Sequence, residues 1–331
     1  MHFTKMQGAG NDFIILDNRD DSLSAFSFPS LAAALCPRKV SIGADGLMIL
    51  KPARENCDFS MEFYNADGSL GEMCGNGARC LTRYALTHGL CGESDKVRIH
   101  TSAGTVTGYA AGKGVYTIQL NDPEVYVPHL VLDAMETDWE CAYMELGHPG
   151  LPHLILALPD SMAYGQNALF LLAKALRAHP ALPKGANVNF YRFLEHNAIA
   201  LYTFERGVED FTLACGTGAG CTAAHLAASG LAAPNDVVIH APGGILRVCL
   251  TLSCPMTSST SNTACSAANT ACILPCSAKD QISVHWTSAG KNIHDIFLTG
   301  PALFVAEGEI SPDILPDRIS DIPTGIFQDS T

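Results

Sequence analysis

Charged residues are scarce in this chain, and basic residues are the scarcer kind. Of its 331 residues only 16% are charged, and 20 Lys and Arg stand against 33 Asp and Glu, a net charge of −13. So few cations cannot form the basic face that nucleic acids require, which excludes a nucleic-acid partner. With 47% apolar residues, the chain is instead expected to be globular and long enough for two domains.

Long apolar runs are also lacking. No stretch approaches the roughly 18 uninterrupted apolar residues of a membrane-spanning helix. The N-terminal Met-His-Phe-Thr-Lys lacks the apolar core of a signal peptide. We therefore expect a cytoplasmic protein without a membrane partner.

Paired metal-ligand spacings are missing despite 13 cysteines. The count is odd and no export signal is present, so thiols are expected rather than a disulfide framework. Five residues separate Cys74 from Cys80 and three separate Cys272 from Cys276, and neither pair is joined to a second pair as in a zinc site. No metal is expected.

A repeated turn is the most informative feature that the sequence does contain. Residues 73–80 read Met-Cys-Gly-Asn-Gly-Ala-Arg-Cys, and residues 214–221 read Ala-Cys-Gly-Thr-Gly-Ala-Gly-Cys. Aligned on Cys74 and Cys215, the copies share five positions, and each is followed by an Ala-rich run that predicts a helix. Two unrelated turns have no reason to agree so closely, so the repeat indicates internal duplication.

The elements predicted around the two copies recur in the same order. Strands precede and follow each copy, with one central helix in each half, which indicates an α+β protein. The turn Asn121-Asp122-Pro123 predicts a boundary between residues 1–121 and residues 122–310. Residues from about 311 to 331 are expected to complete the N-terminal half.

One segment is different in composition. Residues 253–278 are small, polar and nearly uncharged. We interpret them as a hairpin insertion between strands predicted at 245–252 and 282–286, rather than as a functional loop.

Two cysteines at helix starts favour proton transfer at a carbon atom. Unpaired backbone N–H groups there lower a thiol pKa and can also bind a carboxylate. With the helix starts face to face, one thiolate would remove a proton next to the carboxylate, and the opposing thiol would return one from the other side. We predict this role for Cys74 and Cys215, and packing roles for Cys80 and Cys221. Neither copy has the lysine ending or glycine spacing of a phosphate-binding loop.

These motifs and others along the chain resemble the diaminopimelate epimerase family. Besides the two cysteine turns, the resemblance rests on Phe3-Thr4-Lys5-Met6, Gly10-Asn11-Asp12-Phe13, Gly43-Ala44-Asp45-Gly46, Phe63-Tyr64-Asn65-Ala66-Asp67-Gly68-Ser69, Asn187-Val188-Asn189-Phe190, Glu205-Arg206-Gly207, Leu298-Thr299-Gly300-Pro301-Ala302 and Glu307-Gly308-Glu309-Ile310. It implies an epimerase, independent of pyridoxal phosphate and of any other cofactor, that interconverts LL- and meso-diaminopimelate in lysine and peptidoglycan synthesis. It also implies a homodimer and the epimerase fold, in which two pseudo-symmetric domains each wrap a curved, mostly antiparallel sheet around a central helix.

The resemblance assigns roles to residues in the matching motifs. Cys74 and Cys215 would be the acid–base pair, and Glu205 the acid near the reacting amino group. The carboxylate at the reacting carbon would be held by the backbones of Gly75, Asn76, Gly216 and Thr217. The distal amino-acid end of the substrate would be held by Asn11, Asn65, Asn187 and Arg206, with Arg206 a fork for its carboxylate.

One segment departs from the family pattern Gly-Asn-Pro-His. The chain reads Gly147-His148-Pro149-Gly150-Leu151-Pro152-His153. We interpret this as His148 in place of a substrate-binding Asn, with three residues inserted before the second histidine. His148 and His153 are therefore further candidates for substrate contact. The departure leaves open a cofactor-independent racemase of another amino acid, such as histidine, and more remotely a non-enzymatic thiol-rich binding protein.

Overall fold

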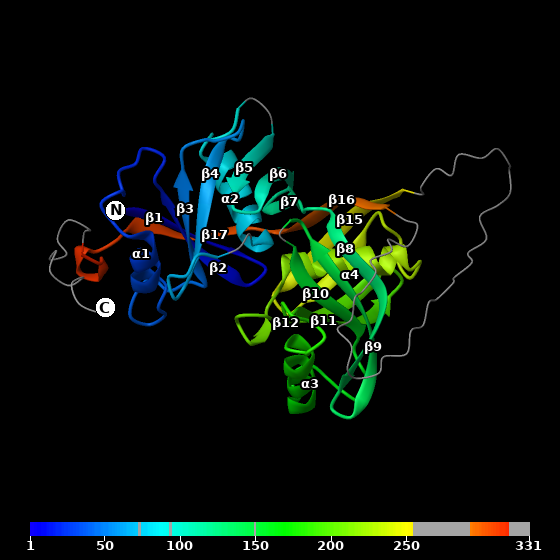
Figure 1. The fold of residues 1–331 in the computed structure, drawn as a ribbon. Coiled ribbons are helices and arrows are strands. Elements are labelled where there is room, and N and C mark those ends of the chain that lie inside the picture. Colours follow the sequence, from blue (N-terminus) through cyan, green and yellow to red (C-terminus); the bar gives the residue numbers. More distant parts are fainter. Residues whose placement is uncertain (72–73, 93–94, 149, 254–291, 318–331) are drawn as a thin grey trace, which may run out of the picture.

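The computed structural model shows two lobes joined by strands near the C-terminal end of the chain (Figure 1). It describes residues 1–71, 74–92, 95–148, 150–253 and 292–317. The strand predicted at 282–286 lies outside the described residues, as does the insertion predicted at 253–278 apart from its first residue.

The N-terminal lobe is a curved sheet around one helix. Its strands are β1 (His2–Gly8), β2 (Asn11–Asp17), β3 (Gly46–Lys51), β4 (Phe59–Asn65), β5 (Lys96–Thr101), β6 (Gly104–Gly112) and β7 (Val115–Gln119). Helix α1 (Phe28–Leu35) covers one face of the sheet, and α2 (Gly75–Thr87) is the central helix. Proline in the first turn of α1 is well placed, because the N–H that proline lacks has no partner there.

The C-terminal lobe repeats this plan. Its strands are β8 (Pro123–Ala134), β9 (Thr137–Leu146), β10 (Leu151–Ala157), β11 (Asn187–Glu195), β12 (Ala198–Glu205), β13 (Asp210–Thr212), β14 (Val237–Ala241) and β15 (Gly244–Ser253). Helix α3 (Asn167–Arg177) packs outside, and α4 (Gly216–Ala228) lies at the centre.

Strand pairing shows the duplication directly. From β1 to β7 the successive neighbours pair antiparallel, parallel, antiparallel, parallel, antiparallel and antiparallel. The series β9, β10, β11, β12, β14, β15 and then β16 (Asn292–Pro301) pairs in the same order. The α+β prediction with two related halves is confirmed.

Two closing strands join the lobes. β16 pairs with β15 on one side and with β7 on the other. β17 (Leu303–Glu309) then pairs with β1, and a 3-10 turn, η1 (Pro312–Ile314), follows. The strand that returns to the N-terminal lobe therefore lies upstream of the expected 311–331, and residues 318–331 lie outside the described part. Most of β17 is exposed, so its sequence carries little of the apolar alternation that marks a strand.

We retain the boundary near Asn121 as a proposal, since β7 ends at Gln119 and β8 begins at Pro123.

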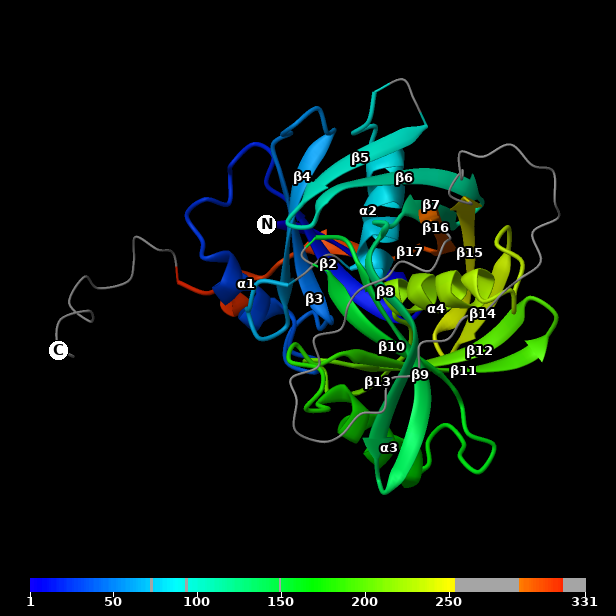
Figure 2. The ribbon, with the colours of Figure 1, turned by 45° about the vertical axis from the view of Figure 1, so that its right-hand side comes forward.

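Figure 2 shows the two central helices, α2 and α4, whose side-chain surroundings differ. In α4 every residue from Gly216 to Ala227 is buried, which explains its small Gly, Ala, Thr and Cys side chains. Helix α2 presents larger side chains, among them Leu81 and Tyr84, to the core of its own sheet. Burial on this scale fixes the start of each helix. Within the described residues no helix is both long and apolar enough to cross a membrane.

Candidate active site

The two central helices each begin directly after the first cysteine of the repeated turn. Cys74 and Cys215 are their N-cap residues, with φ and ψ of −108° and 118° for the first and −109° and 115° for the second. Both thiols are half-buried. The second cysteines, Cys80 and Cys221, are fully buried in the core, as expected for packing residues.

The two helix starts touch each other. A Cβ built on Gly75 would lie 3.5 Å from the Cα of Gly216, and one built on Gly216 would lie 3.3 Å from the Cα of Gly75. Leu298 of β16 lies beneath both glycines, with Cδ2 at 3.3 Å and 2.9 Å from those Cβ positions. The structure thus brings both cysteine turns to one place between the lobes.

The second glycine of each turn lies close to a side chain of a neighbouring strand. A Cβ at Gly77 would overlap the methyl group of Met48 on β3, and a Cβ at Gly218 would overlap Oδ1 of Asn189 on β11. The end of the Met48 side chain is flexible, whereas hydrogen bonds hold Asn189, so packing demands glycine more strongly at Gly218. The glycine pattern has a structural cause in addition to any contact with a ligand.

Burial raises the pKa of both cysteine thiols, and that of Cys215 well above its usual value. Around Cys74 the backbone amides of Gly77 and Asn76 act in the opposite direction. Around Cys215 the nearby Glu205 raises the pKa further, against the Thr217 hydroxyl and a backbone amide. The lowered thiol pKa that we predicted from the helix starts is wrong for the free protein, because desolvation outweighs the helix N–H groups.

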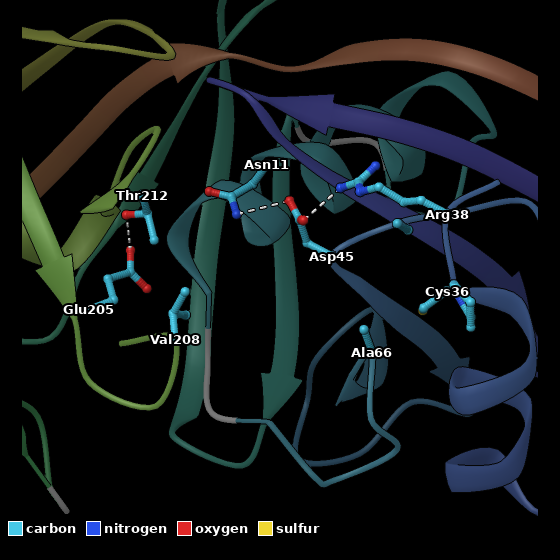
Figure 3. A pocket seen from close by; sticks show the side chains of 10 residues that line it. Asn11, Cys36, Arg38, Asp45, Ala66, Glu205, Val208 and Thr212 are labelled. Atoms are coloured by element: carbon cyan, nitrogen blue, oxygen red, sulfur yellow. Dashed lines mark hydrogen bonds and ion pairs between the residues drawn. The ribbon is translucent and has the colours of Figure 1, made fainter. Parts of the chain in front are cut away.

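Glu205 stands beside Cys215 at the end of β12. Its carboxylate accepts a hydrogen bond from Thr212 Oγ1 at 2.6 Å, and its charge raises the pKa of the Cys215 thiol. Burial raises the pKa of this carboxyl group. In Figure 3 the Glu205–Thr212 pair faces Asn11 and Asp45 across an open space.

The Asn76 side chain connects the two lobes. Asn76 Nδ2 donates to Asn11 Oδ1 at 2.7 Å and to the backbone oxygen of Ala214 at 2.8 Å. Asn11 Nδ2 in turn lies 3.3 Å from Asp45 Oδ2. Asn76 is only 1% exposed, so its side chain is fully engaged and only its backbone N–H faces the helix start.

His153 supports the turn of Cys215 from below. It is fully buried, and its Nδ1 accepts from Asn189 Nδ2 at 3.1 Å. The remaining ring proton is then on Nε2, which donates to Thr217 Oγ1 at 3.1 Å. Burial lowers the pKa of His153 to about 3, so the ring is neutral. Asn189 was absent from the sequence prediction, although its spacing from Asn187 places both on one side of a strand.

Asn187 and Arg206 lie next to this group. Asn187 Oδ1 accepts from the backbone N–H of Arg206 at 2.8 Å, and its Nδ2 is 3.5 Å from His153 Nε2. The Arg206 guanidinium donates through Nη1 to the Lys184 backbone oxygen at 2.8 Å. These contacts set the direction of the arginine side chain.

Two candidates lie further out. Asn65 is exposed and donates to Ser69 Oγ at 2.9 Å, closing its own turn. His148 is exposed in the turn between β9 and β10. Gly150-Leu151-Pro152-His153 itself has the spacing Gly-x-Pro-His, and Leu151 begins β10 as Asn11 begins β2. We therefore propose Leu151 as a second candidate, beside His148, for the position of the family's Asn.

A pocket of about 460 Å³ opens between the lobes beside these residues (Figure 3). Its walls come from both lobes: Asn11, Cys36, Pro37, Arg38, Ala44, Asp45, Ala66, Glu205, Val208 and Thr212. Within the described ranges, no three His, Cys, Asp or Glu side chains are grouped so that they could hold a metal ion.

Comparison with known proteins identifies diaminopimelate epimerases among the sequence relatives. The family model described as "Diaminopimelate epimerase" matches residues 3–118 and 147–254. The diaminopimelate epimerase of Synechococcus sp. (strain JA-2-3B'a(2-13)) is 34% identical over 262 residues, which cover 75% of this chain and 90% of that protein. That of Aquifex aeolicus (strain VF5) is 36% identical over 259 residues, covering 75% and 89%.

Solved structures with a similar fold are more distant in sequence. A probable proline racemase from Agrobacterium radiobacter K84, with bound carbonate, has a TM-score of 0.63 at 15% identity and covers 94% of this chain and 93% of its own. A Bacillus anthracis phenazine biosynthesis protein of the PhzF family has a TM-score of 0.59 at 13% identity, covering 94% and 99%. At such identities the likeness shows the fold alone, and it confirms the predicted two-domain epimerase-like fold.

Proposed function

The chain belongs to the diaminopimelate epimerase family, and we propose that it interconverts LL- and meso-diaminopimelate by proton transfer between Cys74 and Cys215. The chain is an isomerase. The two-cysteine mechanism and the role in lysine and peptidoglycan synthesis are our proposals. One observation carries the proposal: two cysteine-capped helix starts of the same backbone conformation touch between the lobes.

The substrate carboxylate is held by the two helix starts. Backbone N–H groups at a helix start have no partner within the helix and carry partial positive charge. Here two such sets meet, supplied by Gly75 and Asn76 of α2 and by Gly216 and Thr217 of α4. As the α-proton leaves, negative charge spreads onto the carboxylate, where these fixed donors stabilise it most.

The protons move along one line through the α-carbon. A thiolate on one side takes the α-proton, and the bonding electrons remain on the carbon and its carboxylate. The thiol on the other side then gives its proton to the opposite face, which inverts the centre. The number of protons is conserved, and the two cysteines have exchanged roles. Because burial raises both thiol pKa values, each thiolate is a stronger base than an ordinary one.

The remaining polar groups hold the rest of the substrate. Glu205 beside Cys215 is suited to the ammonium on the reacting carbon. The Arg206 guanidinium is suited to the distal carboxylate of the substrate. Asn11, Asn187 and, further out, Asn65 would hold the same distal end. We propose an amino-acid substrate, no cofactor and a homodimer.

A racemase of another amino acid is the second candidate. Leu151 at the position of the family's Asn favours it, because leucine offers no hydrogen bond to a second amino-acid end. Incubation in D2O with LL-diaminopimelate and with a panel of single amino acids distinguishes the two by deuterium exchange at Cα. We expect exchange in diaminopimelate. Exchange confined to a single amino acid such as histidine would select the second candidate, and exchange in none would reject both.

A further inference from the structure

Asn11 lies on the pocket wall, and both ends of its side-chain amide have partners. Asn11 Nδ2 donates to Asp45 Oδ2 at 3.3 Å, and Asn11 Oδ1 accepts from Asn76 Nδ2 at 2.7 Å. Asp45 lines the pocket beside Asn11 (Figure 3), whereas Asn76 is only 1% exposed. The nitrogen of the Asn11 amide therefore lies on the pocket side and the oxygen on the buried side.

These contacts belong to one hydrogen-bonded network with a charged group at each end. At the pocket end Asp45 is paired with Arg38, whose Nη2 lies 2.7 Å from Asp45 Oδ1. At the other end Arg79, which is fully buried, donates through Nη2 to Asn76 Oδ1 at 2.7 Å. The amides of Asn11 and Asn76 lie between the carboxylate and the buried guanidinium.

The charged ends determine which way both amides are turned. An ionised carboxylate can only accept hydrogen bonds, and a guanidinium can only donate them. Asp45 therefore requires the nitrogen of Asn11, which leaves the oxygen of Asn11 for Asn76. Arg79 requires the oxygen of Asn76, which leaves the nitrogen of Asn76 for Asn11. The two requirements agree, so each amide has one orientation that satisfies all of its neighbours.

The Asp45 carboxylate is itself held in place. Arg38 donates to Asp12 through Nη1 and Nη2, at 3.0 and 2.6 Å, and its Nη2 also donates to Asp45. Asp45 Oδ2 accepts a further hydrogen bond from the Asp12 backbone N–H at 3.1 Å. Lys5 adds an ion pair to Asp12 at 3.0 Å, so two cations balance two carboxylates. A carboxylate with these contacts has little freedom to turn away from Asn11.

The second cysteine turn lacks the residues that form this network. When the two turns are aligned, Thr217 corresponds to Asn76 and Gly220 to Arg79. The network nevertheless reaches the C-terminal lobe, because Asn76 Nδ2 also donates to the backbone oxygen of Ala214 at 2.8 Å. The orientation of the Asn76 amide thus also decides a contact between the lobes.

We infer that Asp45 is a positioning residue for substrate binding, which fixes the Asn11 amide so that Asn11 offers the substrate an N–H and not an oxygen. This role rests on the proposed epimerase function. Asp45 uses one hydrogen of Asn11 Nδ2, and within the residues that the structure describes the other has no partner. That N–H suits a carboxylate oxygen of the amino-acid substrate. It does not suit an ammonium group, which can also only donate.

Variants of the full-length protein separate donor from acceptor at Asn11. Asn11→Asp replaces the N–H by an acceptor and should raise KM for LL-diaminopimelate about tenfold or more, because a hydrogen bond to a charged group is lost. An unchanged or lowered KM would overturn the inference, since it would mean that Asn11 offers its oxygen to the substrate.

The same kinetics test the positioning role of Asp45. Asp45→Asn leaves the Asn11 amide free to turn and should raise KM about fivefold with kcat nearly unchanged, as expected for the loss of about one binding contact. Asp45→Glu keeps a group that only accepts and should restore most of the affinity. Asp20→Asn, in an exposed turn outside the pocket, is the control and should change neither constant. An unchanged KM in Asp45→Asn would contradict the role.

Stability tests the contact without substrate. In the unaltered chain Asn11→Asp places two acceptor-only groups against each other and should lower the midpoint of urea unfolding. In the Asp45→Asn background the new amide can donate to the new carboxylate, so the same substitution should lower the midpoint by less. Asn56→Asp, exposed in the turn between β3 and β4, is the matched control and should act equally in both backgrounds. Equal losses for Asn11→Asp in both backgrounds would overturn the inference.

Failure of the proposed function would look different. It would appear as no deuterium exchange at Cα of LL-diaminopimelate with the unaltered chain, and the stability comparison would then decide whether Asp45 orients Asn11. Should Asp45→Asn not fold, as checked by near-UV circular dichroism, KM of Asn11→Asp decides.

Discussion

The starts of α2 and α4 share one backbone conformation and have different surroundings. Their N-cap angles differ by 1° in φ and 3° in ψ. Met48 and Asn189 occupy equivalent positions in the two lobes. Met48 lies two residues after the strand partner of Phe13, and Asn189 lies two residues after the strand partner of His153. The support beneath the first turn is thus apolar, and beneath the second it is a hydrogen-bonded network.

This difference shows which parts of the duplication the chemistry needs twice. The two-base inversion that we propose requires two thiols and two sets of N–H donors, and both lobes have them. Charge near the thiols is not kept, because Arg79 corresponds to Gly220, and Asn65 and Glu205 end equivalent strands. Equivalent backbones in the two lobes therefore carry different charged side chains.

Replacing either cysteine is the most severe way to test the equivalence of the two turns. Cys74→Ser and Cys215→Ser should each lower the inversion rate by about 10²–10⁴-fold, because one face of the carbon loses its acid or base. The rate is followed by polarimetry or chromatography of the epimers. Cys91→Ser, at a half-buried cysteine outside the site, is the control and should be unaffected. Wild-type turnover in either site variant would refute the two-base route.

Alanine at the second glycine of each turn sharpens the comparison of the supports. Gly218→Ala would press on Asn189 Oδ1, which also accepts from Thr203 at 2.9 Å, and should cost about 1–3 kcal/mol of unfolding free energy. Gly77→Ala meets only the flexible end of Met48 and should cost less. Urea unfolding measures both. Gly92→Ala, with nothing within 4 Å of the new Cβ, is the control, and equal losses at Gly77 and Gly218 would contradict the predicted contrast.

The pH dependence of stability tests the polar support. Burial lowers the pKa of His153 to about 3 and that of His225 to about 4. Below the unfolded value near 6.5 the unfolded chain binds protons that the folded chain does not, so stability is lost as pH falls. Each histidine contributes about 1.4 kcal/mol per pH unit between its two pKa values. Glu205, whose pKa burial raises, acts in the opposite direction at the acidic end.

Urea unfolding between about pH 8 and about pH 5 measures this slope. We expect the unfolding free energy to fall below about pH 6.5. An unfolding free energy that stays constant or rises as the pH is lowered would show that His153 and His225 take up protons in the folded protein. His225→Phe should remove about half of the slope.

The smallest expected effect concerns the first residues of β2 and β10. In the Leu151→Asn variant β10 begins with an asparagine, as β2 does at Asn11. A new hydrogen bond to the distal end of diaminopimelate, worth about 1 kcal/mol, should lower KM several-fold with little change in kcat. Leu151→Met keeps the apolar character and is the control. A lower kcat with unchanged KM would show that Leu151 does not face the distal end.

Much of the fold could be predicted because its signals are local. The Cys-Gly turns predict where α2 and α4 begin, and the alternation in Phe59–Tyr64 predicts β4. β17 was not predicted, because its exposed residues carry little such alternation, and its pairing with β1 joins segments from the two ends of the chain. Asn189 was missed because its importance comes from a close approach to Gly218 across the fold.

The sequence by itself determined the duplication, the two thiols and the family, since repeated motifs and their spacing are visible along the chain. Tertiary structure decided the state of those thiols. Desolvation depends on everything packed around a group, and it reverses the thiol pKa shift that the helix starts alone predict. It also decided that Glu205, at the end of a C-terminal-lobe strand, raises the pKa of Cys74 in the other lobe as well as that of Cys215.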